Sequence, residues 1–153
     1  MPDNCISQDS LPLILQAVLF IALLITASVF DIKKRIIPDT ICLAVALTGL
    51  IHFDPLKLLG CLSALPFLIA ALVSDKIGGG DIKLTASAGI VLGIEGGMAA
   101  TIIGLTAMLL FYVVYAIIQR LRKRERQWAL PLAPFLSIGC ITVYLINTGG
   151  ITL

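Results

Sequence analysis

Charged residues are scarce in this chain, and their scarcity decides its class. Asp, Glu, Lys and Arg make up 13% of the 153 residues, whereas hydrophobic residues make up 59%. A soluble globular domain has roughly 45–50% apolar residues, so the composition excludes an ordinary soluble protein. The sequence contains no polar linker, internal repeat or low-complexity tract. We therefore expect an integral membrane protein that forms one domain over residues 1–153.

The chain also lacks the cysteine spacing of metal sites. Its four cysteines, Cys5, Cys42, Cys61 and Cys140, form no C-x-x-C pair. Three of them lie inside apolar runs, where a thiol usually packs as a small hydrophobic side chain. The pattern predicts no zinc or iron–sulfur site, and no other cofactor is indicated.

A basic N-terminal region is absent as well. Residues 1–10 carry Asp3 and Asp9 but no Lys or Arg, so they lack the start of a secretory signal. We expect the apolar segment that follows, Leu11–Phe30, to be retained. Its twenty uncharged residues are enough to cross a hydrocarbon core about 30 Å thick at about 1.5 Å per residue.

Further apolar segments predict an all-α fold, a bundle of about six transmembrane helices. The second helix is expected to start at Ile37-Pro38-Asp39, because Pro is favoured in a first turn and an acid is favoured near a helix N-terminus. The fourth is short for a full span and is expected to end at Gly96-Gly97. Trp128 is a candidate interfacial anchor at the start of the sixth. The five further segments cover about 37–53, 56–73, 81–97, 98–119 and 128–147.

The positions of the basic residues predict the orientation. With six spans, the first, third and fifth loops share one side of the membrane and both termini lie on the other. All basic residues except Lys57 fall on the first side, which is therefore expected to be cytoplasmic. The basic run 120–126 is then a short solvated loop rather than a nucleic-acid site, with attraction to anionic headgroups as a side effect. The residues on this side are Lys33, Lys34, Arg35, Lys76, Lys83, Arg120, Arg122, Lys123, Arg124 and Arg126.

Two aspartates fall at the same predicted depth, at the cytoplasmic border. Asp31 ends the first apolar run, and Asp81 begins the fourth after Gly78-Gly79-Gly80. Two carboxyl groups held close together cannot both ionise easily, so one can act as a base toward water and the other as an acid. Without that role, Asp31 would balance Lys33–Arg35 and Asp81 would favour the dipole of its helix. Acids in membrane segments are costly and tend to be functional.

Small residues around both acids favour close helix packing. Thr85, Gly89, Gly93 and Gly97 follow Asp81 at steps of four, so they share a helix face. This face should turn Asp81 into the bundle. Ala27 and Ser28 give a weaker signal of the same kind beside Asp31. The three glycines before Asp81 are expected to allow positive φ, a tight turn and close approach of another backbone.

These motifs resemble those of the type IV prepilin peptidases, including the archaeal preflagellin peptidases, which are membrane aspartyl proteases of the G-x-G-D class. The segment from Asp31 to Asp39, DIKKRIIPD, is similar to the family's D-x-x-x-R-x-I-P-N, with Asp39 in place of Asn. The segment Gly78–Leu84, GGGDIKL, is similar to G-x-G-D-x-K-L. Pro131–Leu136, PLAPFL, resembles the family's P-x-x-P-F-L, although proline in a membrane helix is commonly just a kink.

The resemblance implies Asp31 and Asp81 as the catalytic dyad of an aspartic endopeptidase in the inner membrane. Gly78 and Gly80 are implied as shaping residues and Lys83 as a motif residue, although Lys83 could simply reach the interface. Arg35 and Pro38 could likewise only orient and start a helix. The chain is similar to the short form of the family, without the N-terminal cysteine-rich insert of the bifunctional members that also have N-methyltransferase activity.

The implied substrates are prepilin-like precursors, whose short basic leader stays cytoplasmic while the apolar helix lies beside the enzyme's spans. Serine chemistry is disfavoured, because the single histidine, His52, is predicted on the opposite side from the acids. A small transporter is the main alternative, but it predicts acids near the bilayer midplane and two-fold sequence symmetry, and neither is present. A non-catalytic membrane subunit that keeps the motifs is a third reading.

Overall fold

The computed structural model describes residues 6–52, 54–73, 78–122 and 131–148. These residues are all helical apart from short connections, as the apolar segments predict. Cys5, Lys76, Lys123, Arg124, Arg126 and Trp128 lie outside the described residues, so the expectations for them remain predictions. The elements are α1 (Ile6–Lys34), α2 (Asp39–Thr48), η1 (Gly49–His52), η2 (Pro55–Ala64), α3 (Leu65–Val73), α4 (Gly79–Arg122) and α5 (Ala133–Thr148), where η marks a 3₁₀ helix.

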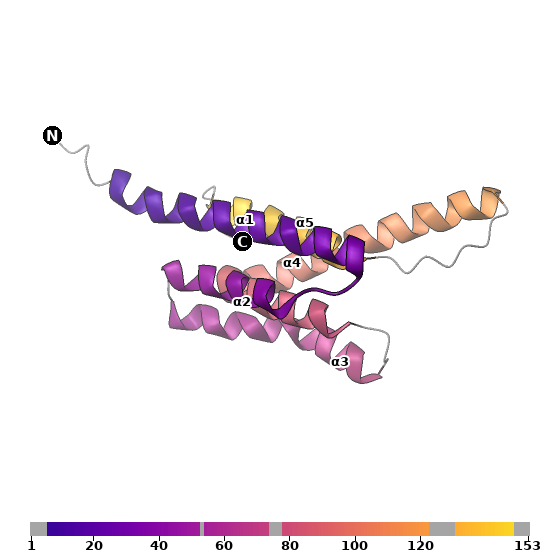
Figure 1. The fold of residues 1–153 in the computed structure, drawn as a ribbon, viewed down its shortest axis with the longest axis horizontal. Coiled ribbons are helices and arrows are strands. Elements are labelled where there is room, and N and C mark those ends of the chain that lie inside the picture. Colours follow the sequence, from indigo (N-terminus) through magenta and orange to yellow (C-terminus); the bar gives the residue numbers. More distant parts are fainter. Residues whose placement is uncertain (1–5, 53, 74–77, 123–130, 149–153) are drawn as a thin grey trace.

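The first apolar run lies within α1, which continues past Asp31 and ends with Lys33 and Lys34 in its last turn. Basic side chains there are stabilised by the partial negative charge at the C-terminal end of the helix dipole. α5 lies alongside α1, while α2 and the η2–α3 segment form the other side of the molecule (Figure 1). The N-terminus of α5 therefore lies near the C-terminus of α1, where Asp31 is.

The third predicted helix forms, but its first half is a 3₁₀ helix. Asp54 caps it by accepting a hydrogen bond from the N–H of Leu56 at 3.0 Å, with Pro55 in the first turn. Ten residues of 3₁₀ helix are unusual, since runs longer than three or four are uncommon. The geometry becomes α-helical at Leu65, just before Pro66, a residue with no N–H to donate.

The expected helix end at Gly96-Gly97 is wrong, because the break lies at Gly93. That residue has φ 78° and ψ 177°, inside the 44-residue span of α4. Such a backbone conformation is essentially restricted to glycine. Gly96 and Gly97 remain helical and buried, so the helix breaks at the single glycine before them and not at the adjacent pair. α4 consists of two helical parts, residues 79–92 and 94–122, and the second projects beyond the rest of the molecule (Figure 1).

Close backbone contact joins η2 to α4. A Cβ on Gly60 would overlap the carbonyl oxygen of Gly89, and a Cβ on Gly89 would overlap that of Gly60. A Cβ on Gly97 would lie 2.8 Å from the hydroxyl oxygen of Ser63. Gly89 and Gly97 of the small-residue face predicted after Asp81 therefore pack against small residues of η2, whereas Gly93 interrupts the helix on which that face was expected. Such pairs let helices approach closely where lipid supplies no hydrophobic driving force between them.

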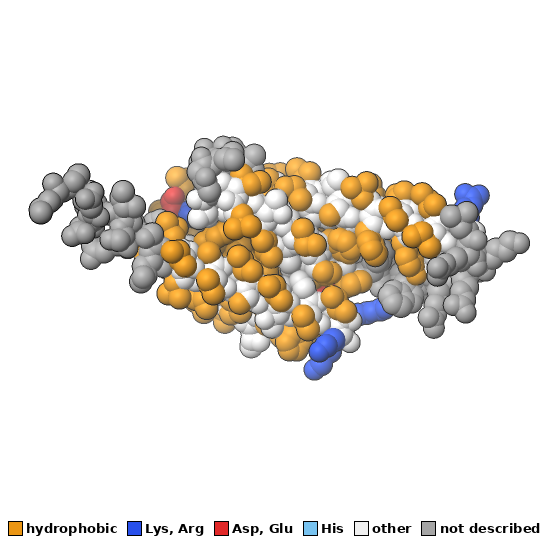
Figure 2. Space-filling model, turned by 90° about the horizontal axis from the view of Figure 1, so that it is seen from above, with side chains coloured by type: hydrophobic (Ala, Val, Ile, Leu, Met, Phe, Trp, Pro, Cys, Tyr) orange, Lys and Arg blue, Asp and Glu red, His pale blue; other side chains and the backbone are white. Residues whose placement is uncertain are grey.

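The outer surface is largely apolar. The buried core includes Phe20, Leu24, Leu84, Leu136 and Val143, yet many large hydrophobic side chains remain exposed, such as Leu72 at 81%. Figure 2 shows apolar side chains over most of one face. Two segments, Pro12–Lys34 and Gly79–Arg120, are long and apolar enough to cross a membrane. Large exposed apolar surfaces mark contact with a membrane or partner, and here they cover elements throughout the fold.

Candidate active site

Asp31 is held in a buried position at the end of α1. It is 8% exposed, and its Oδ2 accepts a hydrogen bond from the backbone N–H of Ala133 at 3.0 Å. The helix ends shortly afterwards because Arg35 has a positive φ of 53°, while its N–H donates to the carbonyl of Asp31 at 2.9 Å. A residue in this left-handed conformation is a common way to end a helix.

Asp81 lies in the first turn of α4, as the glycine stretch before it predicts. Its N–H donates to the carbonyl of Gly78 at 3.1 Å. The side-chain Oδ1 is buried, and no donor in the described part of the chain reaches it. A buried carboxyl oxygen without a partner is costly. It is the kind of exception that points to a functional role rather than to stability.

The structure brings both acids to one cavity of about 370 Å³. The cavity lies where the end of α1, the start of α2 and the start of α4 meet, so the fifty residues between the acids in sequence do not separate them in space. Every predicted site residue of the first two motifs except Pro38 lines it. The lining residues are Asp31, Arg35, Ile36, Ile37, Asp39, Gly78, Gly79, Gly80, Asp81 and Lys83.

The glycines before Asp81 allow close packing because they lack a side chain, and none of them adopts positive φ. Gly93 is the glycine with positive φ in the described residues, so Gly78–Gly80 do not use the positive-φ freedom that their sequence allows. A Cβ on Gly80 would lie 3.1 Å from the Cβ of Ile37, in the turn between α1 and α2. A Cβ on Gly78 would lie 3.6 Å from Oδ2 of Asp81. Gly80 therefore allows close approach of the two motifs, and Gly78 lies directly beside the acid.

Lys83 and Asp39 link the two motifs at the rim of the cavity. The Nζ of Lys83 lies 2.8 Å from both carboxylate oxygens of Asp39, with side-chain exposures of 56% and 74%. Such exposed ion pairs contribute little to stability. Pro38 has φ −62° and ψ 135° and is the N-cap of α2, which begins at Asp39, two residues after the predicted start at Ile37. The proline fixes where α2 starts beside the acids.

The helix expected from Trp128 is described from Ala133 onward, and Pro131 and Leu132 are not helical. Pro134 is the second residue of α5, where its missing N–H costs no helix bond. Pro131 therefore precedes the helix and Pro134 lies in its first turn, so neither proline kinks α5. Their segment carries the N–H that bonds Asp31.

The sequence model of the type IV leader peptidase family matches residues 18–117, which include both acids. The chain belongs to this family. A prepilin leader peptidase/N-methyltransferase of Bacillus subtilis (strain 168) is 37% identical over 138 residues, covering 84% of this chain and 54% of that relative. The chain thus spans about half the length of the curated relative. No solved structure matches it.

The sequence of this member of the leader peptidase family does not predict two of its contacts. The Ala133–Asp31 bond depends on a backbone N–H, which has no side-chain signal, and only the proline motif marked the segment. The second contact joins Ser28 to Ser137, whose hydroxyl oxygens lie 2.9 Å apart. At Ser28 the sequence predicts only close helix packing. Within the described residues, no group of three or more His, Cys, Asp or Glu side chains is placed to hold a metal ion.

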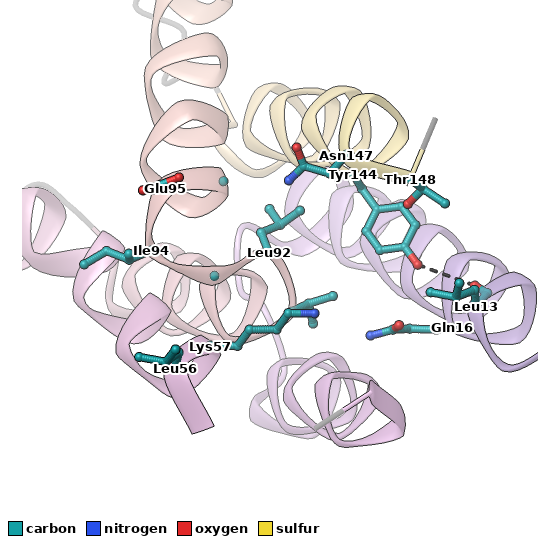
Figure 3. A pocket seen from close by; sticks show the side chains of 13 residues that line it. Leu13, Gln16, Leu56, Lys57, Leu92, Ile94, Glu95, Tyr144, Asn147 and Thr148 are labelled. Atoms are coloured by element: carbon teal, nitrogen blue, oxygen red, sulfur yellow. Dashed lines mark hydrogen bonds between the residues drawn. The ribbon is translucent and has the colours of Figure 1, made fainter. Parts of the chain in front are cut away.

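A second cavity, of about 580 Å³, surrounds the break at Gly93 (Figure 3). It lies at the other end of α1 from Asp31, since its lining includes Leu13 and Gln16. Lys57 projects into it and passes 3.9 Å from the position of a Cβ on Gly93, whereas Glu95 lies beyond the break. A positive charge near a helix C-terminus and a negative charge near a helix N-terminus are each stabilised by the helix dipole. The two charges therefore fit the two helix ends that the break creates.

Replacing Gly93 with Ala should destabilise the protein by roughly 1–3 kcal/mol, because alanine is strained at this φ and ψ. The space itself is not limiting, since the nearest atom to an added Cβ is the Lys57 Cγ at 3.9 Å. Thermal unfolding in lipid nanodiscs measures the effect. Gly79→Ala is the control, because Gly79 lies in a helix with nothing within 4 Å of an added Cβ. Equal stability of the two variants would contradict the prediction.

Proposed function

We propose that this protein is a membrane aspartic endopeptidase that removes the short basic leader from prepilin-like precursors. Asp31 and Asp81 are its catalytic dyad. The observation that carries the proposal is the meeting of both carboxyl groups in one cavity, with an oxygen of Asp81 buried and unpartnered. Membership of the leader peptidase family supports the same activity.

The reaction requires one ionised and one protonated carboxyl group. The ionised acid takes a proton from water, the resulting hydroxide attacks the scissile carbonyl, and the other acid protonates the departing amine. The shared proton is needed because two anions in one small cavity repel each other. The two carboxyl groups of the dyad carry out both proton transfers, so both must lie close to the scissile bond.

The cavity suits a substrate that is polar on one side and apolar on the other. Arg35, Asp39 and Lys83 stand at the polar side, while the helices around the acids present apolar side chains outward. We propose that the spans cross the inner membrane six times, with both termini outside and the dyad on the cytoplasmic side. In that orientation the leader reaches the dyad from the cytoplasm, and the apolar helix of the precursor lies in the bilayer.

The test is co-expression with a candidate prepilin-like precursor, comparing the wild type with Asp31→Ala and Asp81→Ala. We expect leader removal, seen as a mass shift of the precursor, to be lost in both variants. Membrane levels of each variant must match the wild type. Leader removal at wild-type levels in either variant would refute the dyad. A transporter would instead leave the precursor uncut by every variant and by the wild type.

A further inference from the structure

The last described helix reaches back to the first acid motif. The N–H of Ala133, the first residue of α5, donates to Oδ2 of Asp31 across 102 residues of sequence. Both residues are buried, Ala133 completely. This is a bond to a candidate reacting group, and it comes from a segment that the two acid motifs do not include.

The Ala133 N–H needs an acceptor from outside its own helix. The first N–H groups of an α-helix have no partner within it. Pro134 has no N–H, and the N–H of Leu136 donates to the carbonyl of Leu132 at 3.1 Å. The proline thus removes one first-turn donor and the turn uses another. The carboxylate of Asp31 accepts from the donor that points away from α5.

We propose that the N-terminus of α5 is a positioning element that sets Asp31 as the base of the dyad. Because an N–H only donates, Oδ2 is fixed as an acceptor and is unavailable for the dyad proton. A hydrogen bond donated to a carboxylate favours its ionised form, which is the form that a base needs, and leaves Oδ1 to take the proton from water. Asp81, whose Oδ1 has no donor within the described residues, then holds the proton and serves as the acid. This assignment rests on the proposed function.

A second contact, one turn further along, fixes the register of α1 and α5. The hydroxyl groups of Ser28 and Ser137 lie 2.9 Å apart, and each also lies within hydrogen-bond distance of the carbonyl of Leu24, at 2.8 and 3.2 Å. Ser137 is buried, with 3% exposure. Two points of attachment on the same helix pair prevent rotation of α5 that would move the Ala133 N–H away from Asp31.

The opposite side of α5 packs closely on the second part of α4, residues 94–122, which the break at Gly93 separates from the part that carries Asp81. A Cβ on Gly139 would overlap the carbonyl oxygen of Ala100, and a Cβ on Gly104 would lie 3.0 Å from the Cα of Leu136. The rings of Phe135 and Phe111 have centroids 5.3 Å apart. α5 is therefore held between α1, which carries Asp31, and the second part of α4, which restricts movement of the Ala133 N–H relative to Asp31.

The sharpest test removes this one N–H with almost no change of shape. Incorporating lactic acid in place of Ala133 converts the amide to an ester in the full-length chain. We expect kcat for leader cleavage to fall at least about tenfold, as for loss of a hydrogen bond to a charged group. KM should stay within about twofold, because the N–H does not contact substrate. Ordinary mispacking would raise KM as well.

The matched control is the same amide-to-ester change at Leu136, using leucic acid. It removes another first-turn N–H of α5, but one bonded to Leu132 rather than to Asp31. We expect a similar fall in the unfolding temperature and a kcat within about twofold of the wild type. Equal losses of kcat in both esters, or a loss confined to KM, would overturn the positioning role.

A second pair of variants covers the case in which the Ala133 ester does not fold. Ser137→Ala removes a hydroxyl of the register contact and should lower kcat about two- to fivefold at unchanged KM. Ser137→Thr restores the hydroxyl and should recover most of it. Absence of any difference between them would count against the proposal. Cleavage by Asp31→Ala would instead refute the proposed function, whatever the esters do.

Discussion

Purified protein carrying Asp81→Asn should cleave a prepilin-like precursor about 1,000-fold more slowly than the wild type, within the range expected for loss of a general acid. Asparagine has almost the same shape as aspartate but cannot hold or release the proton. The Oδ1 atom that it replaces has no donor within the described residues, so no hydrogen bond there is lost. The unfolding temperature should be unchanged or higher, because a costly buried acid is removed. Cleavage is followed by mass spectrometry in nanodiscs.

Asp39→Asn is the matched control for that experiment. It makes the same chemical change in the same cavity, but at a carboxylate that is 74% exposed and paired with Lys83. We expect most of the activity to remain, since this acid lies at the rim and exposed pairs contribute little. A rate for Asp81→Asn within tenfold of the wild type would contradict a role in proton transfer. Equal losses in both variants would indicate a general effect of cavity charge.

The largest loss of stability is expected from Gly60→Ala, at least about 2 kcal/mol, because the new methyl group has no room. An added Cβ would overlap the carbonyl oxygen of Gly89 and lie 2.9 Å from the carbonyl carbon of Gly93. These are backbone atoms, which cannot move aside as a flexible side chain can. The η2 helix must separate from α4, and the unfolding temperature in nanodiscs should fall accordingly.

The control again makes one change of the same size. Gly79→Ala adds a methyl group where nothing lies within 4 Å, and alanine is a better helix former than glycine. We expect its unfolding temperature to equal or slightly exceed that of the wild type. A Gly60→Ala protein as stable as this control would mean that η2 and α4 are not in backbone contact in the bilayer.

The sequence predicted elements whose causes are local. The uncharged run before Asp31 and the Pro38-Asp39 start both depend on residues close in sequence, and both appear in the structure. The position of the break in α4 does not depend on local sequence alone. From the sequence alone, the adjacent pair Gly96-Gly97 favours a helix break more than the single Gly93 does. In the structure, however, Gly96 packs against α5 and Gly97 against Ser63, and both stay helical. Which glycine leaves the helix is decided by its neighbours in space.

The candidate site could be predicted only where side chains mark it. Matching the depths of two charged borders placed Asp31 and Asp81 near each other, since apolar run lengths fix where a helix ends in a membrane. The third participant could not be found in that way. Ala133 acts through its backbone, and its side chain is that of any small apolar residue. Only the folded chain reveals where its N–H points.

The bond between Asp31 and Ala133 also sets an order of events during biosynthesis. The first acid and its cavity wall emerge from the ribosome early, while the helix that orients the acid emerges 102 residues later. A chain still being synthesised therefore carries both aspartates before it has the element that aims one of them. Under the proposed function and positioning role, the dyad would reach its full cleavage rate only after α5 has been inserted.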